Sequence, residues 1–207
     1  MKIYGYPNTR SARAVWTLEE AGASYDYVHV NLLKGEARQP AFLKVNPGGK
    51  LPAFVDGDLV LTESGAICTH IADQFPAAKL SPPHASAERA QFHQWCLFAL
   101  TELEQPLWTL SKHQFALPEK VRVPAIMDTA RWEFAHAAKL FANGLGDREY
   151  IVGDTLTVAD ILLANTLNWA RVRKLEIEPP SLNAYADRLL SRPALKRALE
   201  REKRAQE

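Results

Sequence analysis

The sequence predicts two domains, a small α/β domain with the element order β-α-β-α-β-β-α followed by an all-α helical domain. Up to residue 77, short apolar runs of strand length alternate with amphipathic helical patterns, whereas from residue 88 onward only the helical period recurs. The intervening residues 78–87 contain Pro82-Pro83 and small side chains, which is typical of a linker. We therefore expect one domain at 1–77 and the other at 88–207.

Local signals indicate each element of the first domain. Asp56-Gly57-Asp58 between two apolar runs is a strong hairpin signal. Gly22 follows the first helical pattern and Pro76 closes the last one. The expected strands are Lys2–Tyr6, Tyr25–Val30, Leu51–Val55 and Leu59–Leu61, and the expected helices are Arg10–Ala21, Pro40–Val45 and Ser64–Phe75.

The second domain carries helical apolar stripes. The first stripe contains Pro106, which we expect to kink its helix. A later stripe begins at Thr157-Val158-Ala159-Asp160, a capping box whose side chains satisfy free amides at a helix start. Leu156 and Ile161 occupy the positions of a hydrophobic staple around this cap, which favours a structural role for the box.

Charge and hydropathy exclude several classes of protein. The net charge is +1, and in the basic tail from Arg197 to Arg204 the acidic Glu200 and Glu202 are interleaved, which favours a solvated last helix over a nucleic-acid surface. No apolar run is long enough to span a membrane. The N-terminal residues show no signal-peptide pattern, so we expect a cytoplasmic location and neither nucleic acid nor membrane as a partner.

Cysteine and histidine spacing argues against a metal site. Cys68 and Cys96 form no CxxC pair and lie in helical patterns with apolar neighbours, so we expect two free, buried thiols. The six histidines show no ligand spacing such as HxH or HExxH, so we expect no metal.

Three segments of the first domain indicate one binding site. Tyr6–Arg13 joins the first strand to the first helix, where free amides and the hydroxyls of Tyr6, Thr9 and Ser11 favour an anion such as a thiolate. In Lys50-Leu51-Pro52, a cis bond before proline would turn the Leu51 backbone outward, toward a peptide-like ligand.

The third segment lies where the hairpin gives way to a helix. The Ser64 hydroxyl and the helix amides suit a ligand carboxylate, and Glu63 suits an ammonium group. One ligand with a thiol, a peptide backbone and an α-amino acid head satisfies all three segments.

These segments resemble the soluble glutathione S-transferases, of the serine-type theta, phi or beta kind. Lys50-Leu51-Pro52-Ala53-Phe54 and Glu63-Ser64-Gly65-Ala66-Ile67 match a block of that family almost residue for residue. Thr157-Val158-Ala159-Asp160-Ile161 and Arg192-Pro193-Ala194 match motifs of its C-terminal domain. The resemblance spans nearly the whole chain and implies a thioredoxin-like first domain, glutathione as co-substrate and a homodimer.

The resemblance also implies residue roles. Leu51, before a cis Pro52, would pair with the cysteinyl backbone of glutathione, and Glu63 and Ser64 would hold its γ-glutamyl group. Lys50, with Arg38 or Gln39, would contact the glycyl end.

The group that activates the thiol is left open by the sequence. Thr9 falls at the serine-type position and Tyr6 at the tyrosine-type position, while Ser11, Asn8 and backbone amides are further alternatives. Thr9 and Ser11 also suit plain helix capping. Trp108 and Phe115 are the residues that we expect to line a hydrophobic substrate pocket.

The expected function is conjugation of glutathione to small hydrophobic electrophiles, a detoxification reaction. Asn8-Thr9-Arg10-Ser11 contains no cysteine, so the reacting sulfur must arrive with the ligand. Peroxidase, disulfide-bond reductase or isomerase chemistry with the same thiolate is an alternative. A non-enzymatic glutathione-binding interaction module is another.

Overall fold

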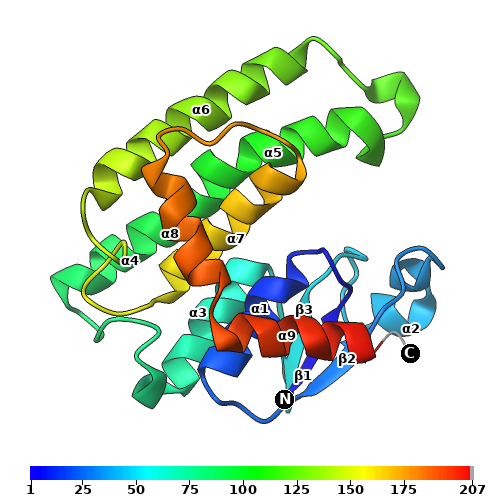
Figure 1. Ribbon diagram of the computed structural model, residues 1–207. Helices are drawn as coiled ribbons and strands as arrows, with labels where there is room; N and C mark the ends of the chain where they lie inside the picture. The colour runs from blue at the N-terminus through cyan, green and yellow to red at the C-terminus, as the bar shows by residue number, and fades with distance from the viewer. Residues whose placement is uncertain (206–207) are drawn as a thin grey trace. The chain divides into compact units, whose positions relative to one another are not determined.

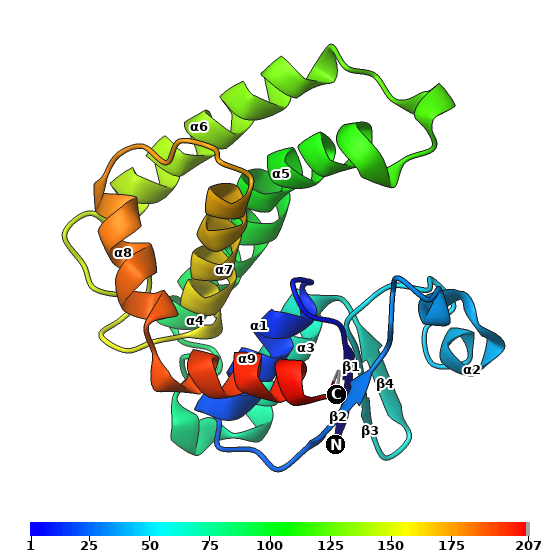
Figure 2. The same ribbon diagram turned by 45° about the vertical axis from the view of Figure 1, so that its right-hand side comes forward.

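The computed structural model describes residues 1–205, and its contacts divide the chain into two compact units (Figures 1 and 2). Unit 1 comprises Met1–Ser81 together with the chain from Ser191 onward, and unit 2 comprises Pro82–Leu190. Within residues 1–205, no helix has both the length and the apolar character needed to cross a membrane. The two units are described separately below.

Unit 1 is built on a four-stranded mixed sheet with the strand order β2-β1-β3-β4. β1 pairs in parallel with β2 and antiparallel with β3, and β3 pairs antiparallel with β4. The register sets Tyr4, Ala53 and Thr62 in one row across three strands. The strands are β1 (Lys2–Gly5), β2 (Asp26–His29), β3 (Ala53–Asp56) and β4 (Leu59–Thr62).

Alternate residues of the sheet enter two different cores, as the period of a β-strand requires. Ile3 and Phe54 are buried, and the Phe54 ring meets His70 of α3 at 5.9 Å. Their neighbours Tyr4 and Ala53 pack instead with Phe42 of α2. The helical elements of this part are α1 (Ser11–Glu20), η1 (Glu36–Arg38), α2 (Pro40–Leu43), α3 (Ser64–Gln74) and η2 (Pro76–Ala78).

The last helix, α9 (Pro193–Arg204), belongs to unit 1 because it packs along α1 (Figure 1). Its buried stripe is Ala194, Leu195, Ala198 and Glu202. The structure thus differs from the expected division, in which residues 88–207 form one helical domain. It also corrects the expectation of a solvated last helix, since Glu202 is only 1 % exposed.

Unit 2 is entirely helical among its described residues. Pro106 lies in the first turn of α5, and a π-helical segment, Ala99–Leu103, directly precedes that helix. Proline lacks an N–H and crowds the carbonyl four residues back, so the wider π turn accommodates it at the expected site of a kink. The elements are α4 (Ala87–Phe98), η3 (Ala99–Leu103), α5 (Glu104–Ser111), η4 (Lys112–Ala116), η5 (Glu119–Val121), α6 (Ile126–Leu145), α7 (Val158–Val172) and α8 (Ser181–Leu190).

The capping box predicted at the start of α7 is present. Asp160 accepts hydrogen bonds from the backbone N–H of Thr157 at 2.9 Å and of Ile151 at 2.8 Å, and from the Tyr185 hydroxyl at 2.8 Å. Burial raises the pKa of Asp160, and these donors oppose the rise. Asp160 is therefore a structural acid of unit 2.

Candidate functional site

The three segments singled out in the sequence meet at one end of the sheet of unit 1. The row Tyr4–Ala53–Thr62 joins the carboxyl end of β1 to the amino end of β3 and the carboxyl end of β4. Because β3 is antiparallel to both neighbours, the chain after Tyr4, before Ala53 and after Thr62 emerges at the same edge. Sheet topology therefore gathers the hydroxyl loop, the Leu51–Pro52 segment and the start of α3.

The hydroxyl loop places Thr9 and Ser11 side by side, with 2.9 Å between their side-chain oxygens. The Thr9 hydroxyl donates to the Tyr6 carbonyl at 2.7 Å and accepts from the Ser11 N–H at 3.2 Å. Thr9 is half-buried, whereas Ser11, the first residue of α1, is fully buried. Of the two hydroxyls, only that of Thr9 belongs to a residue with a solvent-accessible surface.

The Ser11 hydroxyl points into a buried cluster that reaches α9. Its oxygen lies 2.9 Å from Oε1 of Glu202 and 3.0 Å from the Tyr6 carbonyl, and it accepts from the Tyr6 N–H at 3.2 Å. A Cβ at Gly5 would lie 2.8 Å from this hydroxyl and from that of Tyr27, so only glycine fits there. Ser11 thus ties the first strand, the first helix and the last helix together.

The carboxyl group of Glu202 is the strongly perturbed acid of this cluster. Burial raises its pKa from 4.5 to about 7, and donation from Ser11 opposes the rise. The Tyr27 hydroxyl is close enough to lower the pKa of Glu202 as well, yet it lies outside hydrogen-bond geometry with the buried Oε2 atom. Burial also raises the pKa of Tyr27, and the Glu202 charge adds to that rise.

Tyr6 and Asn8 complete the loop. The Tyr6 ring meets the His29 ring at a centroid distance of 5.3 Å. Asn8 adopts φ +60°, a left-handed conformation that asparagine tolerates better than most residues. This conformation turns the chain sharply between β1 and α1.

The Leu51–Pro52 peptide bond is cis, as the sequence predicted. Leu51 is half-buried and precedes β3. Within the described part of the chain, no residue hydrogen-bonds to the Leu51 N–H or carbonyl. These two backbone groups can pair with a peptide-like ligand as an added strand does.

Glu63 and Ser64 stand at the start of α3. Glu63 is exposed and adopts φ +64°, which is strained for a residue other than glycine and typical of functional positions. Ser64 is buried, and its hydroxyl accepts a hydrogen bond of 3.4 Å from Nη1 of the fully buried Arg13. A buried guanidinium and a helix N-terminus together favour a carboxylate at this position.

The residues expected at the glycyl end are exposed. Arg38 ends η1 and donates to the Gly48 carbonyl at 3.3 Å, and both Arg38 and Lys50 are exposed. The topology therefore brings cationic side chains near the Leu51 segment.

Trp108 and Phe115, the residues expected in the substrate pocket, belong to unit 2. Trp108 is half-buried in α5, and Phe115 in η4 is 61 % exposed with the Arg173 guanidinium 5.6 Å from its ring centroid. An open cavity of about 400 Å³ on this unit contains neither residue. Its lining is Lys139, Asn143, Glu178, Pro179 and Pro180.

Sequence reasoning missed three side chains of this site. Glu202 lies 191 positions from Ser11, and no local pattern links the two. Arg13 is fully buried in α1, and a charged residue on the buried face of a helical pattern is a detectable signal. Asn46 is 7 % exposed and hydrogen-bonded to the loop before Leu51, and an asparagine before Pro47-Gly48-Gly49 is a detectable turn signal.

Comparison with known proteins agrees with this geometry. The family model described as "Glutathione S-transferase, N-terminal domain" matches residues 1–73, and that described as "Glutathione S-transferase, C-terminal domain" matches residues 112–193. Glutathione S-transferase F10 of Arabidopsis thaliana is 34% identical over 167 residues, covering 78% of this chain and 76% of the relative.

Solved bacterial structures share the whole fold. BphK, a bacterial glutathione S-transferase solved as a ternary complex, superposes with a TM-score of 0.87 at 32% identity, covering 98% of this chain and 100% of that one. A sphingomonad glutathione S-transferase complexed with glutathione superposes with a TM-score of 0.85 at 31% identity, covering 98% of this chain and 99% of that one. Because plant and bacterial members both match, the similarity extends to the family and not to one class. The chain therefore belongs to the glutathione S-transferase family.

Proposed function

We propose that this glutathione S-transferase binds glutathione at the sheet end of unit 1 and ionises its thiol with the Thr9 hydroxyl. The observation that carries the proposal is the row Tyr4–Ala53–Thr62, which brings the three ligand-binding segments to one edge. The sphingomonad relative, solved with glutathione, supports the choice of ligand.

Each segment would take one part of the tripeptide. The N–H and carbonyl of Leu51 would pair with the cysteinyl residue, because they lie half-buried before β3. Ser64, supported by Arg13, would hold the γ-glutamyl carboxylate, and Glu63 its ammonium group. Lys50 and Arg38 would face the glycyl carboxylate.

Thr9 suits the role of thiol activator better than Ser11 or Tyr6. The Ser11 hydroxyl is fully buried and bonded to Glu202, so it is not available to a ligand. The Tyr6 ring packs against His29, and it is the Tyr6 backbone that enters the hydroxyl network. The Thr9 hydroxyl needs only to turn its proton from the Tyr6 carbonyl to the sulfur.

The required stabilisation is modest. Lowering a thiol pKa from about 8.5 to about 7 takes roughly 2 kcal/mol of selective thiolate binding. A hydroxyl donor to a charged acceptor supplies about 1.5–3 kcal/mol, and a helix N-terminus such as that of α1 adds about 0.3–1 kcal/mol. One hydroxyl and one helix therefore suffice.

In the proposed reaction the thiol proton leaves to solvent and the sulfur lone pair attacks an electrophilic carbon. A carbon–sulfur bond forms, and the electron pair of the broken bond departs with the leaving group. The second substrate would be a small hydrophobic electrophile. We also propose that the protein is cytoplasmic. We propose further that it forms a homodimer, which the exposed Val60 and Leu97 support. A dimer should sediment with a mass near twice 23.2 kDa.

Two measurements test this function, namely retention on immobilised glutathione and conjugation of chlorodinitrobenzene. Thr9→Ala should raise the pKa of the bound thiol by about one unit, because one charge-assisted hydrogen bond is lost. Turnover below neutral pH should fall about tenfold or more, while KM for glutathione changes by less than about threefold. The ultraviolet absorbance of the thiolate measures that pKa directly.

Thr9→Ser is the matched control, since it keeps the hydroxyl and should retain most of the activity. If Tyr6→Phe raises the thiol pKa and Thr9→Ala does not, Thr9 is the wrong donor. If the wild-type protein neither binds to immobilised glutathione nor conjugates chlorodinitrobenzene, the proposed function is wrong.

A further inference from the structure

Asn46 bridges the loop that leads from α2 to Leu51. Its side chain is 7 % exposed. The amide oxygen accepts from the Gly48 N–H at 2.9 Å, and the amide nitrogen donates to the Lys50 carbonyl at 2.7 Å. An N–H on one side and a carbonyl on the other fit only this orientation of an asparagine amide.

The bond to Lys50 acts on the peptide group that carries the Leu51 N–H. The Lys50 carbonyl and the Leu51 N–H belong to one planar trans unit, in which the two groups point in opposite directions. When Asn46 holds the carbonyl, it therefore also fixes the direction of the N–H, away from Asn46. Within the described residues, Asn46 makes the one hydrogen bond to this peptide group.

The rest of the loop is held by other contacts. The Gly49 N–H donates to the Asn46 carbonyl at 2.9 Å, and Arg38 donates to the Gly48 carbonyl. Gly49 has φ +59°, and a Cβ there would lie 2.8 Å from the Ala37 carbonyl oxygen. The turn of the loop thus has contacts other than the Asn46 donor, whereas within the described residues the Lys50–Leu51 peptide group has only the bond from Asn46.

We propose that Asn46 is a positioning residue for glutathione, which orients the Lys50–Leu51 peptide group so that the Leu51 N–H meets the cysteinyl carbonyl of the ligand. This inference rests on the proposed function, because it needs glutathione at Leu51. Asn46 acts before the chemical step and touches neither the sulfur nor Thr9. Its loss should weaken glutathione binding and leave the activation of bound thiol intact.

Asn46→Asp removes the donor to Lys50 and keeps an acceptor for Gly48. The substitution is nearly isosteric and keeps an oxygen for Gly48, but it replaces the donor to Lys50 with a second acceptor. KM and the dissociation constant for glutathione should rise about tenfold, which corresponds to about 1.4 kcal/mol. The turnover number at saturating glutathione and the pKa of the bound thiol should stay within about twofold and about 0.3 units of the wild-type values.

Asn183→Asp is the matched control in unit 2. Asn183 also donates its amide to a backbone carbonyl, that of Ile177, and its oxygen accepts from Arg171. Because Asn183 lies in α8 of unit 2, the same loss of an amide donor should leave KM for glutathione unchanged. Asn46→Ala, which buries no charge, serves if the aspartate variant does not fold, and it should show the same rise in KM.

Calorimetry with glutathione separates the possible failures. If the wild-type protein does not bind glutathione, the proposed function and this inference both fall. If the wild-type protein binds and Asn46→Asp binds equally well, only the inference is overturned. A fall in turnover with a raised thiol pKa would also overturn it, because that result would link Asn46 to Thr9 rather than to Leu51.

Discussion

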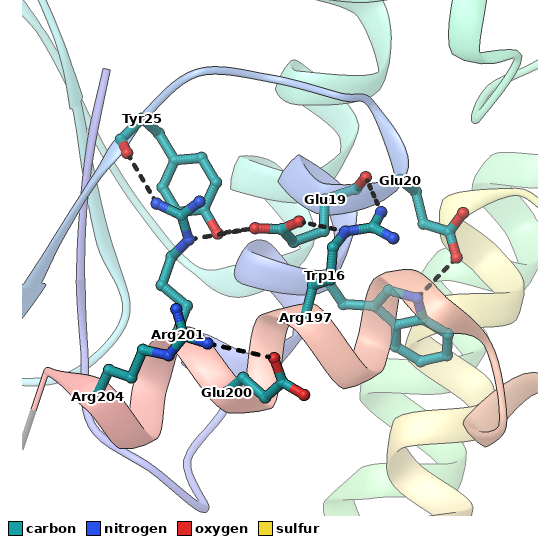
Figure 3. Close-up of polar contacts among 8 residues, drawn as sticks. All are labelled: Trp16, Glu19, Glu20, Tyr25, Arg197, Glu200, Arg201 and Arg204. Carbon is teal, nitrogen blue, oxygen red and sulfur yellow. Dashed lines mark hydrogen bonds and ion pairs between the residues drawn. The ribbon is translucent and has the colours of Figure 1, made fainter.

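The two ends of α1 are both held by α9, but by contacts of different kinds. At the carboxyl end, Glu19 pairs with Arg197 and Arg201 of α9, whose side chains are 54% and 46% exposed (Figure 3). Glu20 pairs with Arg192, the residue before α9, whose side chain is 32% exposed. At the amino end, the contact is the fully buried pair of Ser11 and Glu202. The first end is a charged seam of partly exposed arginines on glutamates that are 10% exposed, and the second is an ionisable group within the protein interior.

The charged seam is dense and mutually satisfied. Glu19 accepts from the Tyr25 hydroxyl at 2.8 Å and from Arg197 at 2.9 Å, and Arg201 pairs with it at 3.2 Å (Figure 3). Burial works to raise the pKa of Glu19, but the donors Tyr25 and Arg197 and the charge of Arg201 outweigh it and lower the pKa. Arg192 reaches Glu20 with two nitrogens, at 2.6 and 2.9 Å.

The difference between the two contacts indicates which part of α9 matters for function. Exposed ion pairs contribute little each, typically about 0–1 kcal/mol, because water and salt screen them. A buried carboxyl that loses its partner costs several times more. Since Ser11 is also hydrogen-bonded to Thr9, the sensitive contact is the one that adjoins the proposed thiol activator.

Ser11→Ala, which breaks the buried contact with Glu202, should have the largest effect on the free energy of unfolding. It removes the donor to the buried Glu202 and the acceptor of the half-buried Tyr6 N–H. We expect the free energy of unfolding in urea to fall by about 3 kcal/mol at a pH where Glu202 is ionised. The pKa of the bound thiol should rise as well, because Thr9 loses a neighbour that fixes its hydroxyl.

Ser81→Ala is the control for that loss, since the Ser81 hydroxyl also donates to a carboxylate, that of Asp73, but at an exposed site. It should change the free energy of unfolding by less than about 0.5 kcal/mol. Equal losses in the two variants would contradict the distinction between buried and exposed contacts.

Glu202→Gln should sharpen the comparison through pH. The native carboxyl has a pKa of about 7 and the unfolded one about 4.5, so the native state holds its proton more tightly. The contribution of this group to stability is therefore complete below about pH 4.5 and is lost as the pH rises toward about 7. Glutamine has no such proton, so relative to this variant the wild-type protein should lose about 3 kcal/mol of stability across that window.

Urea unfolding of both proteins at several pH values measures this difference. Below about pH 4.5 the Glu202→Gln variant should be no more stable than the wild-type protein. Above about pH 7 the difference in the free energy of unfolding between the two proteins should become constant. A constant difference at every pH would show that Glu202 does not titrate within the window.

The features that the sequence predicted well are those whose cause is local. The hairpin at Asp56-Gly57-Asp58, the cis bond before Pro52 and the capping box of Thr157 each depend on a few adjacent residues. The four strands of unit 1 and its helices α1, α2 and α3 follow from hydrophobic period and from turn residues in the same way. The predicted bounds differ by one or two residues, because strand ends depend on pairing partners.

What the sequence missed depends on distant residues. The charge pattern from Arg197 to Arg204 indicates a helix but not its neighbour, so nothing local reveals that one face packs on α1. Glu202 follows the same four-residue spacing as Ala194 and Ala198 on that buried face. A glutamate is common in a solvated helix, so its residue type does not indicate that it is buried. Glu202 becomes the partner of Ser11 only because α9 packs against α1 in the folded protein.

Arg197→Met should test the charged seam with the smallest effect. The variant loses the bond to Glu19, but Glu19 keeps Tyr25 and Arg201. Because the Arg197 side chain is 54% exposed, we expect the free energy of unfolding to fall by about 0.5 kcal/mol at low salt and by nearly nothing at about 1 M salt. Lys203→Met, which removes the same charge from the same helix, is the control for net charge. A salt-independent loss above about 2 kcal/mol would place the seam in the same class as the buried contact of Ser11, and the two ends of α1 would then not differ in the way proposed.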